Sequence, residues 1–208
     1  KMKHLNMMAR KGDFHMKRYS GTGLDLISYP LGGMGAGMLC LNGTGSFGSV
    51  SLRHRPDLFH NPTLFAAVTV LGNQPCARVV EAPVPQNRYF ANVRGAGFGA
   101  AGSSYGLPRF AKGTFEARFP FAEIRLTDDT LPLTAAVTGW SPFVPGDADV
   151  SSLPFAAVEY TFCNTSDRPV SAVFSFHAFN FMRLDDSAAV LKKPNGFVLH
   201  QPGAPEKP

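Results

Sequence analysis

Short runs of alternating hydrophobic and polar residues dominate the second half of the chain. Between residues 115 and 121, phenylalanine and alanine alternate with charged residues and proline. Residues 131–139, 156–162 and 170–178 show the same period of two, which is typical of strands with one buried face. Residues 64–71 form a continuous apolar run, short enough for a buried strand. The pattern therefore predicts a chain built mainly from β-strands.

Turn signals lie between these runs. Asn42-Gly43 precedes the apolar run Phe47–Leu52, and Asn-Gly is a strong hairpin signal. Within residues 115–126 the apolar positions change parity, which predicts a bulge or a corner because side chains alternate faces strictly. The polar link 164–169 predicts that the strands on either side of it pair as an antiparallel hairpin. Further strands are expected at 34–41, 77–81 and 196–200.

No stretch has a clear 3.6-residue period. Residues 82–113 are rich in glycine and proline and are expected to form a long surface loop. Around eight short strands separated by turns predict an all-β fold, an antiparallel β-sandwich, in residues 29–208. Residues 1–28 are basic and lack a period, so we expect an N-terminal arm.

The composition fits a β-sheet protein and argues against one class of partner. Apolar residues make up 44% of the chain, and 18 phenylalanines suit packing on a pleated surface. The net charge of +5 is concentrated near the N-terminus, without a basic stripe interleaved with aromatic residues, which argues against nucleic-acid binding. No apolar run is long enough to cross a membrane, no signal peptide is visible, and the compartment stays open.

Few residues indicate a cofactor or metal. Cys40, Cys76 and Cys163 are widely separated and lack CxxC spacing, so neither a zinc site nor a disulfide framework is predicted, although one pair remains open. GxGxxG matches occur at 43–48 and 97–102, but a strand-like or proline-containing segment follows each, where a dinucleotide site needs a helix. We interpret both as turns.

Several polar residues are candidate site residues. His54 and His60 lie in a polar cluster at 53–61, which fits a solvated turn better than a pocket, and His177 falls on the polar side of its strand. The Asp128-Asp129 and Asp185-Asp186 pairs are typical turn formers, since glycosidase carboxylates come from separate positions.

Three further features remain. Residues 147–151 resemble the start of a calcium loop but lack its glycine and terminal glutamate. Glycosylation sequons occur at 42–44 and 164–166. Trp140 is able to stack on a sugar, but a lone tryptophan is more typical of a core. No residue is therefore assigned as catalytic, cofactor-binding or metal-binding.

Four separated blocks carry a family resemblance. They are Tyr-Pro-Leu-Gly-Gly-Met-Gly-Ala-Gly-Met at 29–38, Phe-Pro-Phe-Ala at 119–122 with Leu-Pro-Leu at 131–133, Trp-Ser-Pro-Phe-Val-Pro-Gly-Asp at 140–147 with Ser-Ser-Leu-Pro at 151–154, and Asn164 with Pro-Val at 169–170. In this order, over roughly residues 28–180, they resemble the N-terminal part of glycoside hydrolase family 116, the family of the bile-acid-type β-glucosidase or non-lysosomal glucosylceramidase. Met34 and Met38 replace the usual aliphatic residues.

The resemblance implies an N-terminal β-sandwich that packs on a C-terminal (α/α)6 domain of the same polypeptide. That domain carries the nucleophile Glu, the acid/base Asp and the β-glycoside substrate. The sequence predicts no helical region able to supply that domain, so we expect a non-catalytic, incomplete sandwich domain of a retaining β-glycosidase, inactive alone. Its Gly-rich hairpins and the 82–113 loop would approach the active-site mouth. The sugar stays open among glucosides, xylosides and N-acetylglucosaminides.

Two other functions were considered. One is a free-standing carbohydrate-binding or interaction sandwich, which a stop codon directly after Pro208 would favour. The other is a small enzyme that uses His54 or His60, which an assay of this chain alone on β-glucosides would test.

Overall fold

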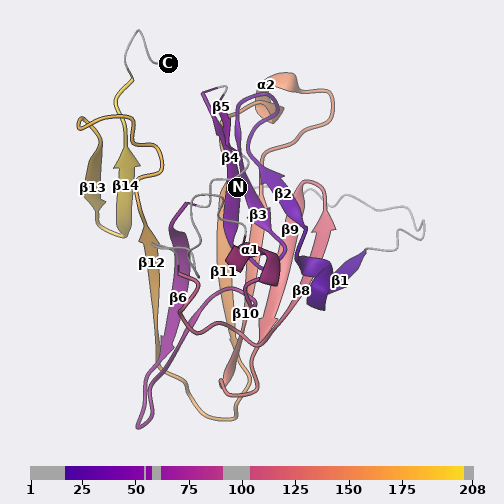
Figure 1. The fold of residues 1–208 in the computed structure, drawn as a ribbon, viewed down its shortest axis with the longest axis vertical. Helices are drawn as coiled ribbons and strands as arrows, with labels where there is room; N and C mark the ends of the chain where they lie inside the picture. Colours follow the sequence, from indigo (N-terminus) through magenta and orange to yellow (C-terminus); the bar gives the residue numbers. More distant parts are fainter. Residues whose placement is uncertain (1–16, 54, 58–61, 91–103, 204–208) are drawn as a thin grey trace, which may run out of the picture.

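The computed structural model describes residues 17–53, 55–57, 62–90 and 104–203 (Figure 1). Within them the chain forms short strands, two short α-helices and one 3₁₀ turn, which confirms the all-β class. The elements are β1 Arg18–Ser20, η1 Gly21–Leu24, β2 Ser28–Leu31, β3 Met38–Asn42, β4 Phe47–Leu52, β5 Arg55–Asp57, β6 Leu64–Val70, β7 Cys76–Val79, α1 Gln86–Phe90, β8 Lys112–Arg118, β9 Phe121–Thr127, β10 Leu133–Trp140, α2 Ala148–Ser151, β11 Ala157–Asn164, β12 Ala172–Ala178, β13 Ala189–Lys193 and β14 Gly196–His200.

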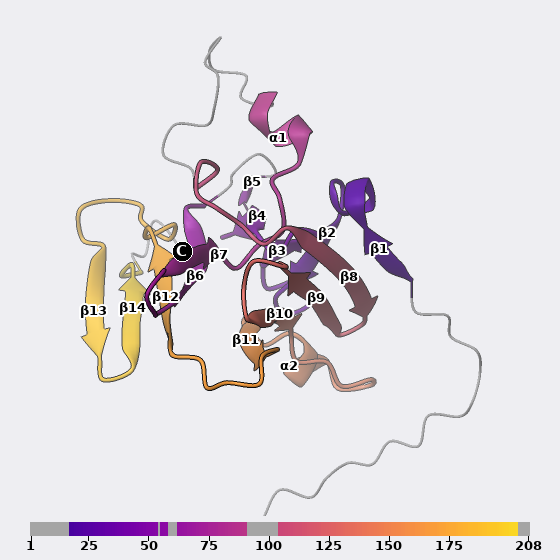
Figure 2. The same ribbon diagram turned by 90° about the horizontal axis from the view of Figure 1, so that it is seen from below.

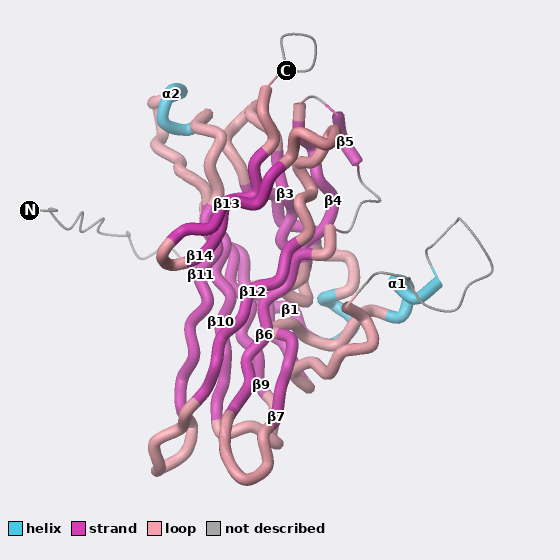
Figure 3. The backbone as a smooth tube through the Cα atoms, turned by 90° about the vertical axis from the view of Figure 1, so that its left-hand side faces the viewer, coloured by secondary structure: helices cyan, strands magenta, loops and turns pink. Residues whose placement is uncertain are grey.

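The strands form two packed layers. One layer is a five-stranded antiparallel sheet with the order β1-β8-β9-β10-β11. The other layer consists of the sheets β2-β3-β4-β5 and β12-β6-β7. Figure 3 shows β10 and β11 facing β6 and β12 across the sandwich. The hairpin β13-β14 stands beside β12 at one side of the molecule (Figures 1 and 2).

The core lies between these layers and follows the alternating pattern of the sequence. Alternate residues of β10 are buried, as its period of two predicts, and alternate residues of β6 are buried although its sequence is a continuous apolar run. Gly139 permits a close approach of the layers, since a Cβ atom there would lie 2.8 Å from a methyl carbon of Leu31. The largest fully buried side chains are Phe110, Phe115, Leu31, Leu41, Ile124, Leu126, Val80 and Val137. Burial of each such side chain contributes about 1.5–3 kcal/mol.

The parity change after Phe119 has a different cause from the one expected. It is neither a bulge nor a corner within one strand, because β8 and β9 are separate strands joined at Phe119 and Pro120. Arg118 pairs with Phe121, so the two residues between them form a tight hairpin turn. A two-residue turn reverses the chain and leaves the same parity signature in the sequence as a bulge.

The expected hairpin between β11 and β12 is wrong. β11 pairs with β10, and β12 pairs with β6, so the polar link carries the chain from one layer to the other. The rings of Tyr160 and Phe174 meet across the sandwich, with centroids 5.4 Å apart. A polar turn ends a strand in either arrangement, and the sequence pattern does not distinguish the two.

Two segments differ from the sequence-based outline. β1 lies within residues 1–28 and pairs with β8, so the sheet includes part of the stretch expected to form an arm. Residues 1–16 lie outside the described residues. In the 82–113 segment, α1 forms one short helix and β8 begins at Lys112, while residues 91–103 lie outside the described residues.

Candidate functional site

Two loops interlock at the end of the sandwich that carries α2, at the top of Figure 1. One is the β2–β3 loop, residues 32–37, and the other is the β10–β11 loop, residues 141–156. The Gly32 amide donates to Ser141 Oγ at 2.7 Å, and the Met34 amide donates to the Ser151 carbonyl at 2.9 Å. A Cβ atom on Gly33 would lie 2.1 Å from the Leu153 carbonyl oxygen, so only glycine fits there. The first and third resemblance blocks thus form one junction.

Ser151 and Asp147 shape the β10–β11 loop. The buried Ser151 hydroxyl accepts from the Val144 amide and donates to the Val144 carbonyl, both at 3.1 Å. Asp147 caps the N-terminus of α2 by accepting from the Val150 amide at 2.9 Å. The residues that resembled a calcium loop therefore build a turn. In the described part of the chain, no three acidic, histidine or cysteine side chains cluster as metal ligands do.

Aromatic side chains surround this junction. Phe119 and Phe143 meet edge to face with centroids 4.7 Å apart. Trp140 lies between Phe121, at 6.3 Å, and Phe155, at 5.7 Å. Trp140 and Phe121 are on the outer side of the five-stranded sheet, and Phe155 belongs to the β10–β11 loop. We call these five residues the aromatic patch. Trp140 is thus a partly exposed outer residue and not part of the core, contrary to the sequence-based expectation.

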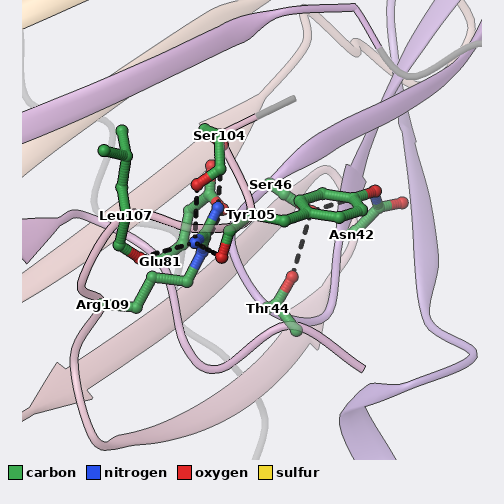
Figure 4. A network of polar contacts seen from close by, with 8 residues as sticks. All are labelled: Asn42, Thr44, Ser46, Glu81, Ser104, Tyr105, Leu107 and Arg109. Atoms are coloured by element: carbon green, nitrogen blue, oxygen red, sulfur yellow. Dashed lines mark hydrogen bonds and ion pairs between the residues drawn. The ribbon is translucent and has the colours of Figure 1, made fainter. Parts of the chain in front are cut away.

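A buried ion pair links Glu81, just after β7, to Arg109, just before β8 (Figure 4). Arg109 Nε lies 3.1 Å from Glu81 Oε2, and the two side chains are 5% and 7% exposed. The same guanidinium donates to the carbonyls of Ser104, Tyr105 and Leu107 at 2.9, 3.1 and 2.9 Å. Arg109 therefore holds residues 104–109 in one conformation. Neither residue stands out in the sequence pattern, which therefore does not predict this pair.

The buried carboxylate affects its surroundings. Burial raises the pKa of Glu81, although the charge and hydrogen bond of Arg109 oppose this shift. Burial, together with the negative charge of Glu81, also raises the pKa of the Tyr160 phenol. The main chain ties this region to the β3–β4 hairpin, because the Ala82 amide donates to the Thr44 carbonyl at 2.8 Å. The Arg109 network is thus a structural element that joins the loop to the core.

The paired aspartates are turn formers, as the sequence predicted. Asp128 accepts from the Thr130 amide at 2.9 Å and hydroxyl at 2.6 Å, and from Arg78 Nε at 2.8 Å. Although burial of Asp128 opposes ionisation, these hydrogen bonds outweigh it and lower its pKa. Asp185 accepts from the Ser187 amide at 2.9 Å and shapes the turn that follows β12.

Both sequons serve the fold. Asn42 and Thr44 are buried in the β3–β4 turn, where Asn42 Nδ2 donates to Ser46 Oγ at 3.1 Å (Figure 4). Asn164 is exposed, but its Nδ2 donates to the Arg168 carbonyl at 2.7 Å, and its Oδ1 accepts from the Ser166 amide at 2.9 Å. These contacts fix the link between β11 and β12.

Among the described residues, the remaining candidates form no site. The 43–48 glycine motif is a hairpin turn followed by strand β4, as interpreted, and the 97–102 motif lies outside the described residues. His54 and His60 also lie outside them. His177 stacks on Phe65 with centroids 4.7 Å apart and shares a 3.0 Å hydrogen bond with Ser175.

A second group of rings fills the space between the ends of the two layers. Tyr160 and Phe162 of β11 contact Phe174 of β12, and Phe176 contacts Tyr160 and Phe197 of β14. We call these five rings the open face. Within the part of the chain that the structure describes, β11 and β12 each pair on one side only. Tyr160 and Phe162 pack against the core, yet Phe174 remains 46% exposed.

A cavity of about 450 Å³ continues the open face between β6, β12 and the β13-β14 hairpin. Its lining is mostly apolar. It consists of Thr63, Phe65, Phe176, His177, Ala178, Phe179, Val190, Phe197 and Leu199. Contiguous exposed apolar surface is a common feature of interaction sites.

Comparison with known proteins identifies the family. No curated protein matches the chain closely enough to serve as a relative. None of the helices in the described part of the chain is long and apolar enough to cross a membrane. Residues 28–198 match the family model described as beta-glucosidase 2, glycosyl-hydrolase family 116 N-term. The chain therefore belongs to glycosyl-hydrolase family 116, as the N-terminal module of a β-glucosidase-like enzyme.

Proposed function

We propose that this chain is the non-catalytic β-sandwich module of a retaining, glucosylceramidase-like β-glycosidase. It packs on an (α/α)6 catalytic domain of the same polypeptide, which binds the β-glycoside and supplies both carboxylates. The family membership supports this assignment. So does the role of the acidic side chains, because Glu81, Asp128 and Asp147 are each used in structural contacts.

The open face is the observation that carries the proposal. A completed sandwich buries the inner faces of both layers, because apolar area removed from water contributes about 25 cal/mol per Å². Here the two layers end at β11 and β12, each with one unpaired edge, and their inner rings are half covered. The remainder of the polypeptide covers this surface, beginning with strands that extend both sheets.

Two neighbouring residues of β12 provide the test. Phe174 points into the open face, whereas Val173 points to the other side of the strand and is 51% exposed. Phe174→Asp and Val173→Asp are introduced into the enzyme that includes the helical domain. We expect Phe174→Asp to lower its melting temperature and its hydrolysis of an aryl β-glucoside, and Val173→Asp to leave both nearly unchanged.

The chain alone completes the experiment. We expect it to bind a hydrophobic dye and to show no hydrolysis of aryl β-glucosides. Turnover by the chain alone at the rate of the longer enzyme would overturn the proposal. Indistinguishable effects of the two β12 substitutions in the longer enzyme would show that the open face is not where the module is covered.

A further inference from the structure

The outer side of the five-stranded sheet presents two adjacent rows of side chains near α2. In the first row, Trp140 lies opposite Phe121 on one neighbouring strand. In the second row, two residues back along β10, Thr138 lies opposite Glu123 on one side and Glu159 on the other. Successive residues on one face of a strand are about 7 Å apart. An aromatic row therefore runs beside a carboxylate–hydroxyl–carboxylate row.

The contacts within these rows hold the side chains in defined orientations. Trp140 Nε1 donates to Glu159 Oε1 at 2.9 Å, which fixes the indole. Thr138 Oγ1 lies 3.4 Å from Glu123 Oε2. Phe121 and Phe155 contact the indole, but they remain 49% and 48% exposed. The surface thus combines exposed ring faces with hydrogen-bond acceptors at the distance of one sugar unit.

We propose that these two rows form a binding site for a neutral oligosaccharide. A pyranose has an apolar C–H face, which stacks on an aromatic ring, and a rim of hydroxyl groups, which donate to carboxylates. Hydrogen bonds to ionised acceptors are about twice as strong as neutral ones. A sugar stacked on Phe121 or Phe155 has its hydroxyls beside Glu123 and Glu159. Glu123 forms an ion pair with Arg125, and together with Glu159 the row still carries a net negative charge, which disfavours an anionic glycan.

The aromatic patch and the open face differ in the side chains that surround their rings. The open face consists of ring surfaces that point between the layers, and strands of the same sandwich fit it. The aromatic patch adjoins acidic and hydroxyl side chains on the solvent side of a sheet, and sugar hydroxyls satisfy these acceptors. The site is independent of the proposed function, because its ligand binds this chain directly.

The orientations of the rings predict how the affinity depends on the length of the oligosaccharide. The Trp140 plane is tilted by 41° from Phe121 and by 65° from Phe155. A single flat chain therefore does not stack on all three rings at once. We expect weak affinity for one sugar unit, with affinity rising with chain length as further units reach the second exposed ring.

Trp140 is the single tryptophan of the whole 208-residue chain, so its fluorescence reports on this site alone. The chain is titrated with cellohexaose and with laminarihexaose. We expect a saturable change in emission and lower quenching by acrylamide with at least one of them. Phe121→Ala, Phe155→Ala and Glu159→Gln each raise the Kd at least five-fold, although Gln still accepts from the indole. Phe179→Ala, at an exposed ring elsewhere, leaves the Kd unchanged.

Two controls keep the test decisive. Saturation-transfer NMR on the wild-type chain detects sugar contact without any substitution, and a melting curve for each variant identifies unfolding. Absence of binding of both hexasaccharides by both methods overturns the proposal, as does an equal effect of Phe179→Ala. If Trp140 in the longer enzyme is shielded from acrylamide before sugar is added, protein covers the patch and the proposal is likewise overturned.

Discussion

The guanidinium of Arg109 lies 3.1 Å from the carboxylate of Glu81, and both side chains are almost wholly buried. The same guanidinium donates to the carbonyls of Ser104, Tyr105 and Leu107, so the pair connects Glu81 to residues 104–109. One arginine therefore satisfies a buried charge and several main-chain acceptors at once. Its removal leaves all of them without their partner.

Arg109→Ala is expected to lower the free energy of unfolding by about 3–5 kcal/mol, because a buried charge that loses its partner is strongly destabilising. Urea denaturation measures the effect. The control is Arg125→Ala, which breaks the exposed pair with Glu123 and is expected to cost less than about 1 kcal/mol. Equal losses for the two variants would contradict the structural role assigned to Arg109.

Gly33→Ala tests the loop junction. A Cβ atom would lie 2.1 Å from the Leu153 carbonyl oxygen, and main chain has to move to relieve the clash. We expect a loss of about 1–3 kcal/mol in the free energy of unfolding. Gly106→Ala is the matched control, since none of the described residues has an atom within 4 Å of a Cβ atom there, and we expect a change within about 0.5 kcal/mol. A tolerated Gly33→Ala would mean that the two loops separate at little cost.

The sequence predicted the strands better than their partners. Period-two patterns located β10, β11 and β12, and a continuous apolar run located β6, because burial of a strand face is a local property that is visible in consecutive residues. Pairing is not local. The link after Asn164 has the turn residues of a hairpin, yet the chain crosses to the other layer. There the inner face of β12 packs across the sandwich against Tyr160 of β11, and β12 does not pair with β11 in one sheet.

The candidate site depended still more on tertiary contacts. The resemblance blocks were found in the sequence, but nothing local indicated that Gly33 and Leu153 meet. The Arg109–Glu81 pair has a separation of 28 residues and no motif. Trp140 seemed a core residue because lone tryptophans usually are, and its outward position follows from the register of β10.

Alkylation of the three cysteines tests how deeply each one is buried. All three are free, with Cys40 buried, Cys76 partly buried and Cys163 exposed. Cys76 Sγ also accepts from Arg78 at 2.9 Å. We expect iodoacetamide to modify Cys163 first and Cys40 only when the chain unfolds, since reaction requires an accessible thiolate. Mass spectrometry of timed samples measures the order. Early modification of Cys40 would place β3 outside the core.

The pKa of Asp128 is lowered in the folded protein, so its contribution to stability depends on pH. In water, an aspartate has a pKa of about 3.9. Below that value the unfolded chain takes up a proton more readily than the folded one. The stabilisation by Asp128 is therefore fully present above about pH 4 and is lost as the pH falls through the lower folded pKa.

Asp128→Asn removes the charge and keeps the shape of the side chain. At pH 7 we expect it to lower the free energy of unfolding by about 2 kcal/mol, because the hydrogen bonds from Thr130 and Arg78 lose their charged acceptor. Asp129→Asn, at the exposed neighbour paired with Lys112, is expected to cost less than about 1 kcal/mol at any pH. Urea denaturation at pH 7 and near pH 3 should show the Asp128 difference shrinking at the lower pH. A difference that stays constant would mean that its origin is the lost shape of the turn and not the carboxylate charge.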